Sequence, residues 1–389
     1  MRTPILLSLI LSLGCGEPEA LDAGPPDAGA DAGPSVRCDA PLDAGQRARG
    51  FSRGCALALV SSGFAIRTRQ AVPLTRWGAF LRAESPDTCP AGSGLSAATL
   101  ITDTDPRSDE ATARVTYHVV GEGEPPGGPD AGAPGWAGLR VVRGSVAVDL
   151  DPMSPRASAL VLLDLALAGL DGAPTIAVVL DGFEVDTDVP QGPGFPDYDP
   201  ADGYALSALG VDVGAPTRDG IDLRFEASAH LELGRSGVPE VDRAASVART
   251  RVRVRYAVVG LASPPIEGTV SYGSECRPED DVAALMISGT PGSHAIPALR
   301  SFELGVDGDG TLVRELAVMI DAFQHDPVTG TTSMRVEGLL EGADLTPLAT
   351  RFDAEVVLLE WAAGGEVASL RYFDTVAEGR AETMLPITP

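Results

Sequence analysis

The residues of this chain that could do chemistry are mainly carboxylates, and one group of them has nearly the spacing of a cation site. Asp197, Asp199 and Asp202 follow the pattern D-x-D-x-x-D-G, and Asp186 and Asp188 precede them. Hard cations such as Ca²⁺ take several carboxylate and carbonyl oxygens, and a D-x-D-x-D-G loop supplies them from one turn. The sequence therefore predicts a calcium site here, which would be structural or would shape a ligand-binding loop.

An ordinary acidic turn is the alternative at this segment. The spacing is one residue longer than in the calcium loop, and no bidentate glutamate follows at the distance of an EF-hand. Asp and Gly also favour turns for reasons of their own. A second acidic cluster has looser spacing still and consists of Asp103, Asp105, Asp109 and Glu110.

No catalytic residue is predicted. The four histidines, His118, His230, His294 and His325, form no metal-spaced pair, and the chain has no G-x-S-x-G, P-loop or C-x-x-C pattern. His118 lies on the polar face of a predicted strand and His325 in a predicted turn, which favours solvated or locally bonded side chains. The chain contains no Lys and no Asn. Schiff-base, Ser-Lys and Cys-His-Asn mechanisms are therefore excluded.

The tryptophans and the net charge narrow the choice of partners. Trp77, Trp136 and Trp361 could serve as sugar-stacking platforms, although one Trp per module is more typical of a core. The formal net charge of −26 disfavours nucleic acid, because a phosphate backbone needs a basic face. It fits a surface protein that stays dispersed and attracts cations.

The N-terminus carries the pattern of an exported protein. A positively charged start, Met1 to Pro4, precedes an apolar run from Ile5 to Leu13 and then Gly14-Cys15. This is a signal peptide, and its apolar run is too short to cross a membrane. A Cys directly after a small residue resembles a bacterial lipobox, in which Cys15 is lipidated and becomes the mature N-terminus. Cleavage at Gly14-Cys15-Gly16 as an ordinary secretory site is the alternative.

The segment that follows is predicted to be a disordered tether. Residues 16–35 repeat Asp-Ala-Gly three times and are small, acidic and Pro-rich, so they cannot offset the entropy of ordering. Such tracts after a lipobox resemble those of surface lipoproteins from high-GC, myxobacterial-type Gram-negative bacteria. The resemblance implies a lipid-anchored protein of the outer membrane or cell surface. It covers about a tenth of the chain and implies no chemistry.

The remaining cysteines fit an oxidising compartment. With Cys15 lipidated, four are left, namely Cys38, Cys55, Cys89 and Cys276. An even number in an exported chain predicts two disulfides, with three connectivities that the sequence leaves open. One bridge with two buried thiols is the alternative.

Internal similarity divides the rest of the chain. Residues 114–121 match 253–260, and residues 176–183 match 316–323, at offsets of 139 and 140 residues. Residues 57–64 and 370–372 carry fainter echoes. These matches predict an N-terminal module over 38–121, a linker over 122–136, a second module over 137–262 and a third over 263–389. Residues 1–14 form the signal peptide and 15–37 the lipidated Cys and tether.

The local patterns predict an all-β fold of tandem antiparallel sandwich-like modules, two full and one shortened. Val252, Val254, Tyr256 and Val258 alternate with polar residues, as in a half-buried strand, and the strand around Tyr117 does likewise. Residues 160–168 and 356–361 are more continuously apolar, each with one acidic residue, which predicts central strands covered on both faces. Frequent Gly and Pro turns, such as Asp171-Gly172, separate the strands.

Two functions from different classes follow. The leading hypothesis is a surface-anchored, non-enzymatic binding or scaffold protein of the cell envelope, with a glycan or an envelope protein as partner, no nucleic acid, and no cofactor other than Ca²⁺. The alternative is an extracellular, glycan-directed hydrolase that uses carboxylates near the insertion at 184–204.

Overall fold

The computed structural model describes most of the chain from residue 57 onward. The described residues are 57–72, 76–83, 93–102, 111–121, 139–150, 155–187, 205–233, 250–273, 282–306, 312–342, 351–362, 367–376 and 380–387. They consist of strands and turns, which confirms the all-β prediction. Residues 36–389 belong to one compact unit. Within the described residues, no helix has the length and apolar character needed to cross a membrane.

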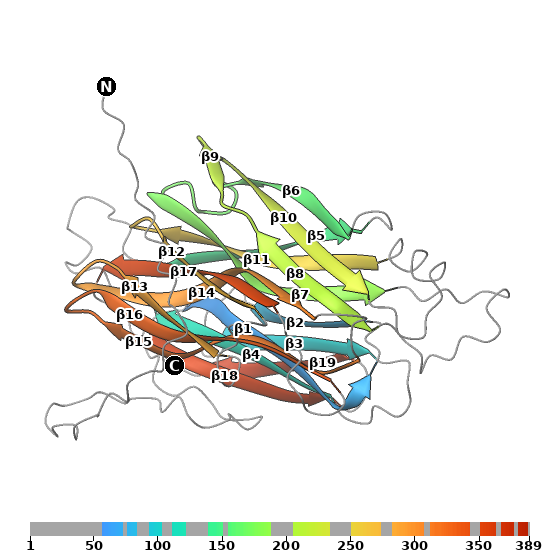
Figure 1. Ribbon diagram of the computed structural model, residues 1–389. Helices are drawn as coiled ribbons and strands as arrows, with labels where there is room; N and C mark the ends of the chain where they lie inside the picture. The colour runs from blue at the N-terminus through green and yellow to red at the C-terminus, as the bar shows by residue number, and fades with distance from the viewer. Residues whose placement is uncertain are drawn as a thin grey trace, which may run out of the picture. The chain divides into compact units, whose positions relative to one another are not determined.

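The strands form three antiparallel sheets (Figure 1). Sheet 1 has the order β13 (Val282–Ser288), β16 (Thr331–Glu341), β15 (Val313–Asp326), β1 (Leu57–Val72), β4 (Ala111–Gly121), β18 (Val367–Val376). Sheet 2 has the order β12 (Ile266–Gly273), β17 (Arg351–Ala362), β14 (Ser293–Gly305), β8 (Leu206–Val213), β10 (Asp222–Leu233), β6 (Arg156–Asp164), and β9 (Thr217–Asp219) also pairs with β10. Sheet 3 has the order β19 (Arg380–Ile387), β3 (Ser93–Thr102), β2 (Arg76–Ala83), β7 (Thr175–Thr187), β11 (Thr250–Leu261), β5 (Arg140–Asp149).

The three sheets are related by a cyclic exchange of strands. One unit, β5 to β8 with β10 and β11, places β5, β7 and β11 in sheet 3 and the other three strands in sheet 2. The next unit, β12 to β17, divides its strands between sheets 2 and 1 in the same order. The first unit has only β1 to β4 before the second begins, and the C-terminal strands β18 and β19 complete its two sheets. Each sheet therefore combines strands from two units.

The third strand of each unit carries the same bulge at the same place. At each bulge one residue of the strand has no partner in register, namely Ser62 in β1, Asp181 in β7 and Arg300 in β14. Two residues later each strand has a buried phenylalanine, and Phe183 lies 119 residues after Phe64, as Phe302 lies 119 residues after Phe183. The bulges and their phenylalanines define equivalent positions in the three sheets.

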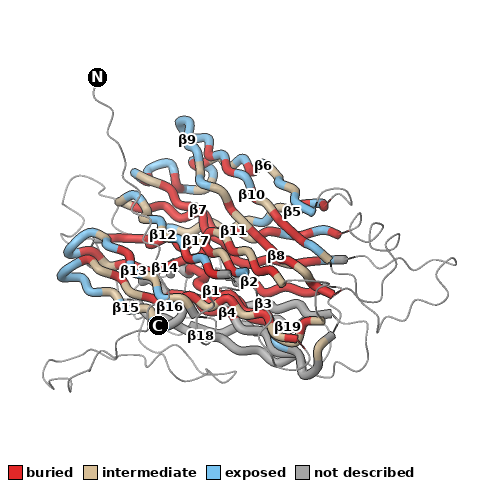
Figure 2. Tube along the Cα trace, in the orientation of Figure 1, coloured by how far each residue is buried: buried red, intermediate tan, exposed pale blue. Residues whose placement is uncertain are grey.

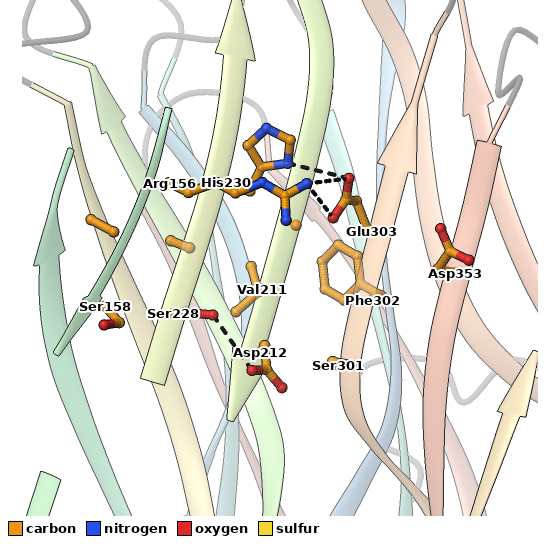
Figure 3. Close-up of a pocket in the computed structure, with 13 residues that line it drawn as sticks. Arg156, Ser158, Val211, Asp212, Ser228, His230, Ser301, Phe302, Glu303 and Asp353 are labelled. Carbon is orange, nitrogen blue, oxygen red and sulfur yellow. Dashed lines mark hydrogen bonds and ion pairs between the residues drawn. The ribbon is translucent and has the colours of Figure 1, made fainter. Parts of the chain in front are cut away.

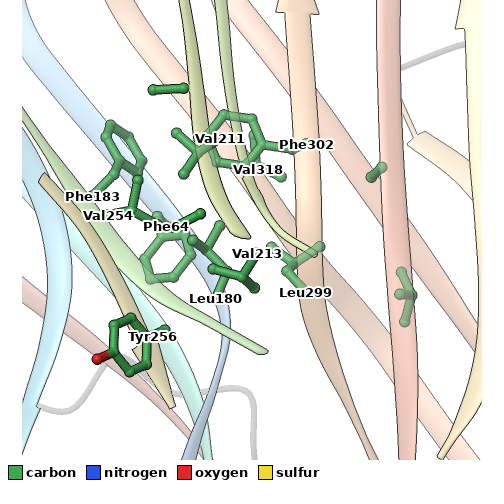
Figure 4. Packing of buried hydrophobic residues seen from close by; sticks show 14 of the residues in the cluster. Phe64, Leu180, Phe183, Val211, Val213, Val254, Tyr256, Leu299, Phe302 and Val318 are labelled. Atoms are coloured by element: carbon green, nitrogen blue, oxygen red, sulfur yellow. The ribbon is translucent and has the colours of Figure 1, made fainter. Parts of the chain in front are cut away.

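The three phenylalanines meet in the main hydrophobic core (Figure 4). The ring of Phe183 lies 6.1 Å from that of Phe64 and 5.5 Å from that of Phe302, and Trp77 stands edge-on to it at 5.6 Å. Aromatic pairs in such tilted geometries contribute about 0.5–1.5 kcal/mol each beyond burial. The core is therefore shared by all three sheets.

Of the two sequence matches that defined the internal repeat, one joins equivalent strands and the other does not. Residues 114–121 and 253–260 lie in β4 and β11, which are both the last strands of their units. Residues 176–183 and 316–323 lie in β7 and β15, which are the third and fourth strands. The equivalent of Phe183 is Phe302. Two buried strands with similar apolar runs and a Phe produce a match without structural equivalence.

Two apolar runs that looked alike have different places in the sheets (Figure 2). Residues 356–361 lie in β17 between two neighbours and are buried, which confirms a central strand. The prediction for residues 160–168 is wrong. Here β6 is the last strand of sheet 2, Leu160 and Leu162 are 62% and 65% exposed, and the chain turns after Asp164. Asp171-Gly172 is a turn, as predicted.

The alternation predicted for the last strands of the units holds in the first half of β11, and it fails at Ala257 of the same strand and in β4. Val252, Val254 and Val258 are buried and Arg251 is exposed. In β4, Thr116 on the predicted polar face is buried too. In β11, Ala257 on the predicted polar face is buried because it belongs to a second hydrophobic cluster, with Val259, Val357 and Trp361 among its members.

Candidate functional site

The sequence-predicted site residues fall mostly outside the described part of the chain. Asp188, Asp197, Asp199, Asp202, the acidic cluster over 103–110, Trp136 and all five cysteines, Cys15, Cys38, Cys55, Cys89 and Cys276, lie there. Asp186 is described and is an exposed residue of β7, paired in register with Arg76 and Arg251. Among the described residues, no group of three or more His, Cys, Asp or Glu could hold a metal ion. The calcium site and the disulfides stay predictions.

The histidines and tryptophans that are described have clear environments. Trp77 and Trp361 are buried, which confirms their assignment to the core. His325 contacts Thr332 and the Ser293 carbonyl oxygen at 2.8 Å each, so it is bonded as predicted, but it lies in β15 and not in the predicted turn. His118 is 4% exposed, and the expectation of a solvated side chain is wrong. Burial lowers the pKa of His118 to about 4.

A polar groove lies on the face of sheet 2 opposite the core, and it is the strongest candidate site (Figure 3). Its volume is about 480 Å³. The side chains that line it come from five neighbouring strands and alternate with core residues along each of them. The polar ones are Arg156, Ser158, Asp212, Ser228, His230, Ser301, Glu303 and Asp353.

A glycine opens the floor of the groove. Gly210 in β8 pairs with His230 of β10 on one side and with Glu303 of β14 on the other. A Cβ atom at this position would lie 3.3 Å from the His230 Cβ and 3.4 Å from the Glu303 Cγ. Without it, the two flanking side chains reach each other across β8.

Glu303 joins the charged groups at one end of the groove. Arg156 Nη2 donates to both of its carboxylate oxygens, at 3.0 and 3.1 Å, and Arg351 donates to Oε1. His230 Nδ1 lies 3.3 Å from Glu303 Oε1 without hydrogen-bond geometry, while its Nε2 is hydrogen-bonded to Glu232 at 3.0 Å. These contacts hold His230 and Glu303 in fixed positions.

The other end of the groove offers a carboxylate among hydroxyl groups. Ser228 Oγ lies 3.5 Å from Asp212 Oδ2, and Ser301 pairs in register with Asp212 from β14. Burial raises the pKa of the Asp212 carboxyl and the charge of Glu355 raises it further, against the opposing effect of Arg300. Carboxylates accept hydrogen bonds, and serine hydroxyls both donate and accept. This end can therefore bind a ligand rich in hydroxyl groups.

The equivalent position in sheet 1 is apolar and filled. There β15 takes the place of β8, and Ala317 pairs with Ala65 of β1 and Leu339 of β16. Ala65, Ala317 and Met319 form a small hydrophobic cluster with Leu339 packed against it. The fold does not require polar residues at this level of a sheet.

The bulges carry a second set of charged residues, with opposite signs in two sheets. In sheet 3, Arg143 Nε donates to Asp181 Oδ2 at 2.7 Å, and Arg255 lies on the next strand. Burial raises the pKa of Asp181, although Arg143 and Arg255 act to lower it. Sheet 2 has the reverse arrangement. Its members are Glu267, Arg300 and Glu355, with Arg300 Nη1 2.5 and 2.7 Å from the two carboxylates.

These bulge clusters are structural, because their central side chains are buried. Asp181 is 1% exposed and Arg300 is 3% exposed. In sheet 1 the same position holds Ser62, with Thr116 on the neighbouring strand, and both are buried. All three sheets have a polar residue at the bulge, but it is neutral in sheet 1, acidic in sheet 3 and basic in sheet 2.

Comparison with protein-family models, with curated proteins and with solved structures finds no match to this chain. The site therefore has to be argued from its own geometry. Sequence reasoning missed it because its residues come from five strands spread over almost 200 positions, and none of them forms a local motif. The one available signal was Gly210 within an apolar, alternating strand, since an isolated glycine there indicates a close approach.

Proposed function

We propose that this protein is an exported, lipid-anchored, non-enzymatic binding protein of the cell envelope, and that the groove of sheet 2 binds a hydroxyl-rich ligand such as an envelope glycan. The signal sequence, Cys15 and the Asp-Ala-Gly tract support the location. The groove supports the binding role.

One observation carries the proposal, namely that sheets 1 and 2 differ at equivalent positions. Ala65, Ala317 and Leu339 show that the scaffold can close this level of a sheet with apolar side chains. In sheet 2 the same level holds Gly210 between His230 and Glu303, and the resulting groove remains open. Sheet 3 also has a glycine beside a glutamate here, Gly78 next to Glu184, but the residue on its other side is Leu100, so polar side chains on both sides distinguish sheet 2. A feature that the fold does not need is best explained by a ligand.

The chemistry of the lining favours a neutral, polyhydroxylated ligand. Arg156 and the serine hydroxyls supply donors, while Asp212, Glu303 and Asp353 supply acceptors. The ion pairs of Glu303 fix one wall before a ligand arrives, which lowers the entropic cost of binding.

A glycan array followed by calorimetric titration tests this function. Asp212→Asn keeps the shape of the side chain and removes its charge, so a glycan that binds the groove should lose about 10- to 100-fold in affinity. Asp222→Asn is the matched control, because Asp222 is an exposed carboxylate on the same face of β10 that does not line the groove. Equal losses in the two variants, or an array with no bound glycan, would contradict the proposal.

A further inference from the structure

The outer edge of sheet 2 is an exposed and partly apolar strand. β6 pairs only with β10 among the described strands, and β5 contacts it without forming a ladder. Leu160 and Leu162 project from it on the groove face, and Leu167 in the turn that follows is 89% exposed. Exposed apolar edge strands tend to pair with another strand, and proteins usually protect them.

The sequence of β6 is complementary to itself when it is read in the opposite direction. The strand has nine residues, so an antiparallel pairing centred on Leu160 places Arg156 of each copy opposite Asp164 of the other. Both charged residues lie at the ends of the strand and also have partners within their own copy, Arg156 with Glu303 and Asp164 with the backbone N–H groups of Ala166 and Leu167. The Arg156 side chain is nevertheless 62% exposed toward the edge. Opposite charges directly across two strands stabilise their pairing.

The remaining pairs in this register are also compatible. On the groove face, Leu160 meets its own copy and Leu162 meets Ser158. On the other face, the small residues Ala157 and Ala159 meet the larger Leu163 and Val161, so large and small side chains alternate across the interface.

We propose that two copies of this chain associate through β6, with antiparallel pairing across a two-fold axis at Leu160. Sheet 2 of one copy continues into sheet 2 of the other, and the pairing covers the leucines of this edge. β6 supplies Arg156, Ala157 and Ser158 to the groove, so the two grooves lie on one continuous face. The dimer does not require a ligand in the groove, although Arg156 belongs to both the groove wall and the paired strand.

The equivalent edge of sheet 1 provides a contrast. β13 occupies the place of β6 in its unit and exposes Met286, which is 72% exposed. Its sequence, VAALMIS, has no charged residue, so no pairing of β13 with its own copy gains an ion pair. Charge complementarity therefore favours β6 over β13 as the interface.

The mass of the full chain in solution tests the proposal. All proteins carry Cys15→Ser, so that lipid-driven association does not contribute, and light scattering after size exclusion gives the mass over a dilution series. We expect a dimer for the parent chain. Leu160→Arg places two like charges opposite each other and should raise the dissociation constant at least about tenfold. Met286→Arg is the matched control and should leave it unchanged.

Three results would overturn the proposal. One is a monomer at every concentration, which makes the exposed edge of β6 an ordinary surface or a site for a different protein. Another is a dimer that survives Leu160→Arg. The third is a dimer that is lost in Met286→Arg, which would place the interface on β13. Circular dichroism of both variants checks that each retains the β fold.

Discussion

Sheets 1 and 2 carry opposite chemistry at the same level of one scaffold. In sheet 2, His230 and Glu303 face each other across Gly210, and in sheet 1, Leu339 and Ala65 pack on Ala317. The register of the two sheets is the same here, so backbone geometry does not explain the difference. Because sheet 1 folds with apolar residues at this level, the polar groove at the equivalent level of sheet 2 is not required for the fold.

The bulge clusters show the opposite relation. Sheets 2 and 3 both place buried charges at the bulge, and the signs are reversed, with Asp181 between arginines in one sheet and Arg300 between glutamates in the other. A buried charge that has lost its partner costs several kcal/mol. In both sheets the buried charge at the bulge is accompanied by residues of the opposite sign, whether the central residue is acidic or basic.

The largest expected effect comes from breaking that balance in sheet 3. Asp181→Arg brings a third guanidinium next to Arg143 and Arg255 in a buried site, and it should cost about 3–5 kcal/mol of unfolding free energy. Adding Arg143→Glu and Arg255→Glu reproduces the charges of sheet 2 around the bulge. Because Arg255→Glu also removes the ion-pair partner of Glu184, the triple variant should restore part of the loss and not all of it. Urea unfolding measures both variants.

Asp149→Arg is the matched control for this series. Asp149 lies on the same strand as Arg143 and pairs with Arg251 in an exposed position, so the same change of charge should have little effect there. A triple variant no more stable than Asp181→Arg would show that the two clusters are not interchangeable.

The sequence predicts those features of the fold that depend on residues close to one another in the chain, and it does not predict those that depend on distant segments. The period-2 pattern in the first half of β11 and the turn at Asp171-Gly172 depend on neighbouring residues, and both are found as predicted, whereas Ala257 further along β11 is buried. The exchange of strands between units depends on contacts between distant segments, which no local pattern carries. The similar apolar runs of β6 and β17 show the limit, since only the assembled sheet makes one an edge and the other central.

The candidate site was beyond prediction for the same reason. Asp212, His230 and Glu303 are unremarkable in their own segments and become a site only when β8, β10 and β14 lie side by side. The phenylalanines at 64, 183 and 302 were a usable signal, because their constant spacing marks the true repeat. Aligning on them, and not on the longest apolar match, would have placed the bulges correctly.

A second prediction concerns the buried histidine of sheet 1. His118 is equivalent to Val357 of sheet 2, and burial lowers its pKa from 6.5 to about 4. The unfolded chain takes up a proton near pH 6.5 and the native state only near pH 4. Stability from the neutral histidine is therefore complete above pH 6.5, and about 3 kcal/mol of it is lost as the pH falls to 4.

His118→Val should remove this part of the pH dependence while costing about 1 kcal/mol at neutral pH through the smaller side chain. Urea unfolding at several pH values between 7 and 4 measures the difference between the variant and the parent chain, so the carboxylates that also titrate in this range cancel. Parallel curves for the two proteins would show that His118 is already protonated in the native state or is not buried.

The smallest expected effect on stability tests the comparison between sheets 1 and 2 most directly. Gly210→Ala gives sheet 2 the residue that sheet 1 has at Ala317. The new Cβ meets its neighbours at 3.3–3.4 Å, which is a tight fit and destabilises the folded state. Replacing glycine by alanine also lowers the conformational entropy of the unfolded chain, which stabilises the fold by about 0.4–1 kcal/mol. These two contributions oppose each other, so unfolding free energy should change by less than about 1 kcal/mol.

Ligand binding should respond more strongly than stability to the same change. The added methyl group lies between His230 and Glu303 on the floor of the groove, where a bound glycan would make its closest approach. We expect Gly210→Ala to weaken glycan binding about tenfold, and Ala317→Gly in sheet 1 to leave it unchanged, as measured by calorimetric titration. If both variants bind as the parent chain does, the open floor of sheet 2 has no part in binding, and the difference between the sheets reflects packing alone.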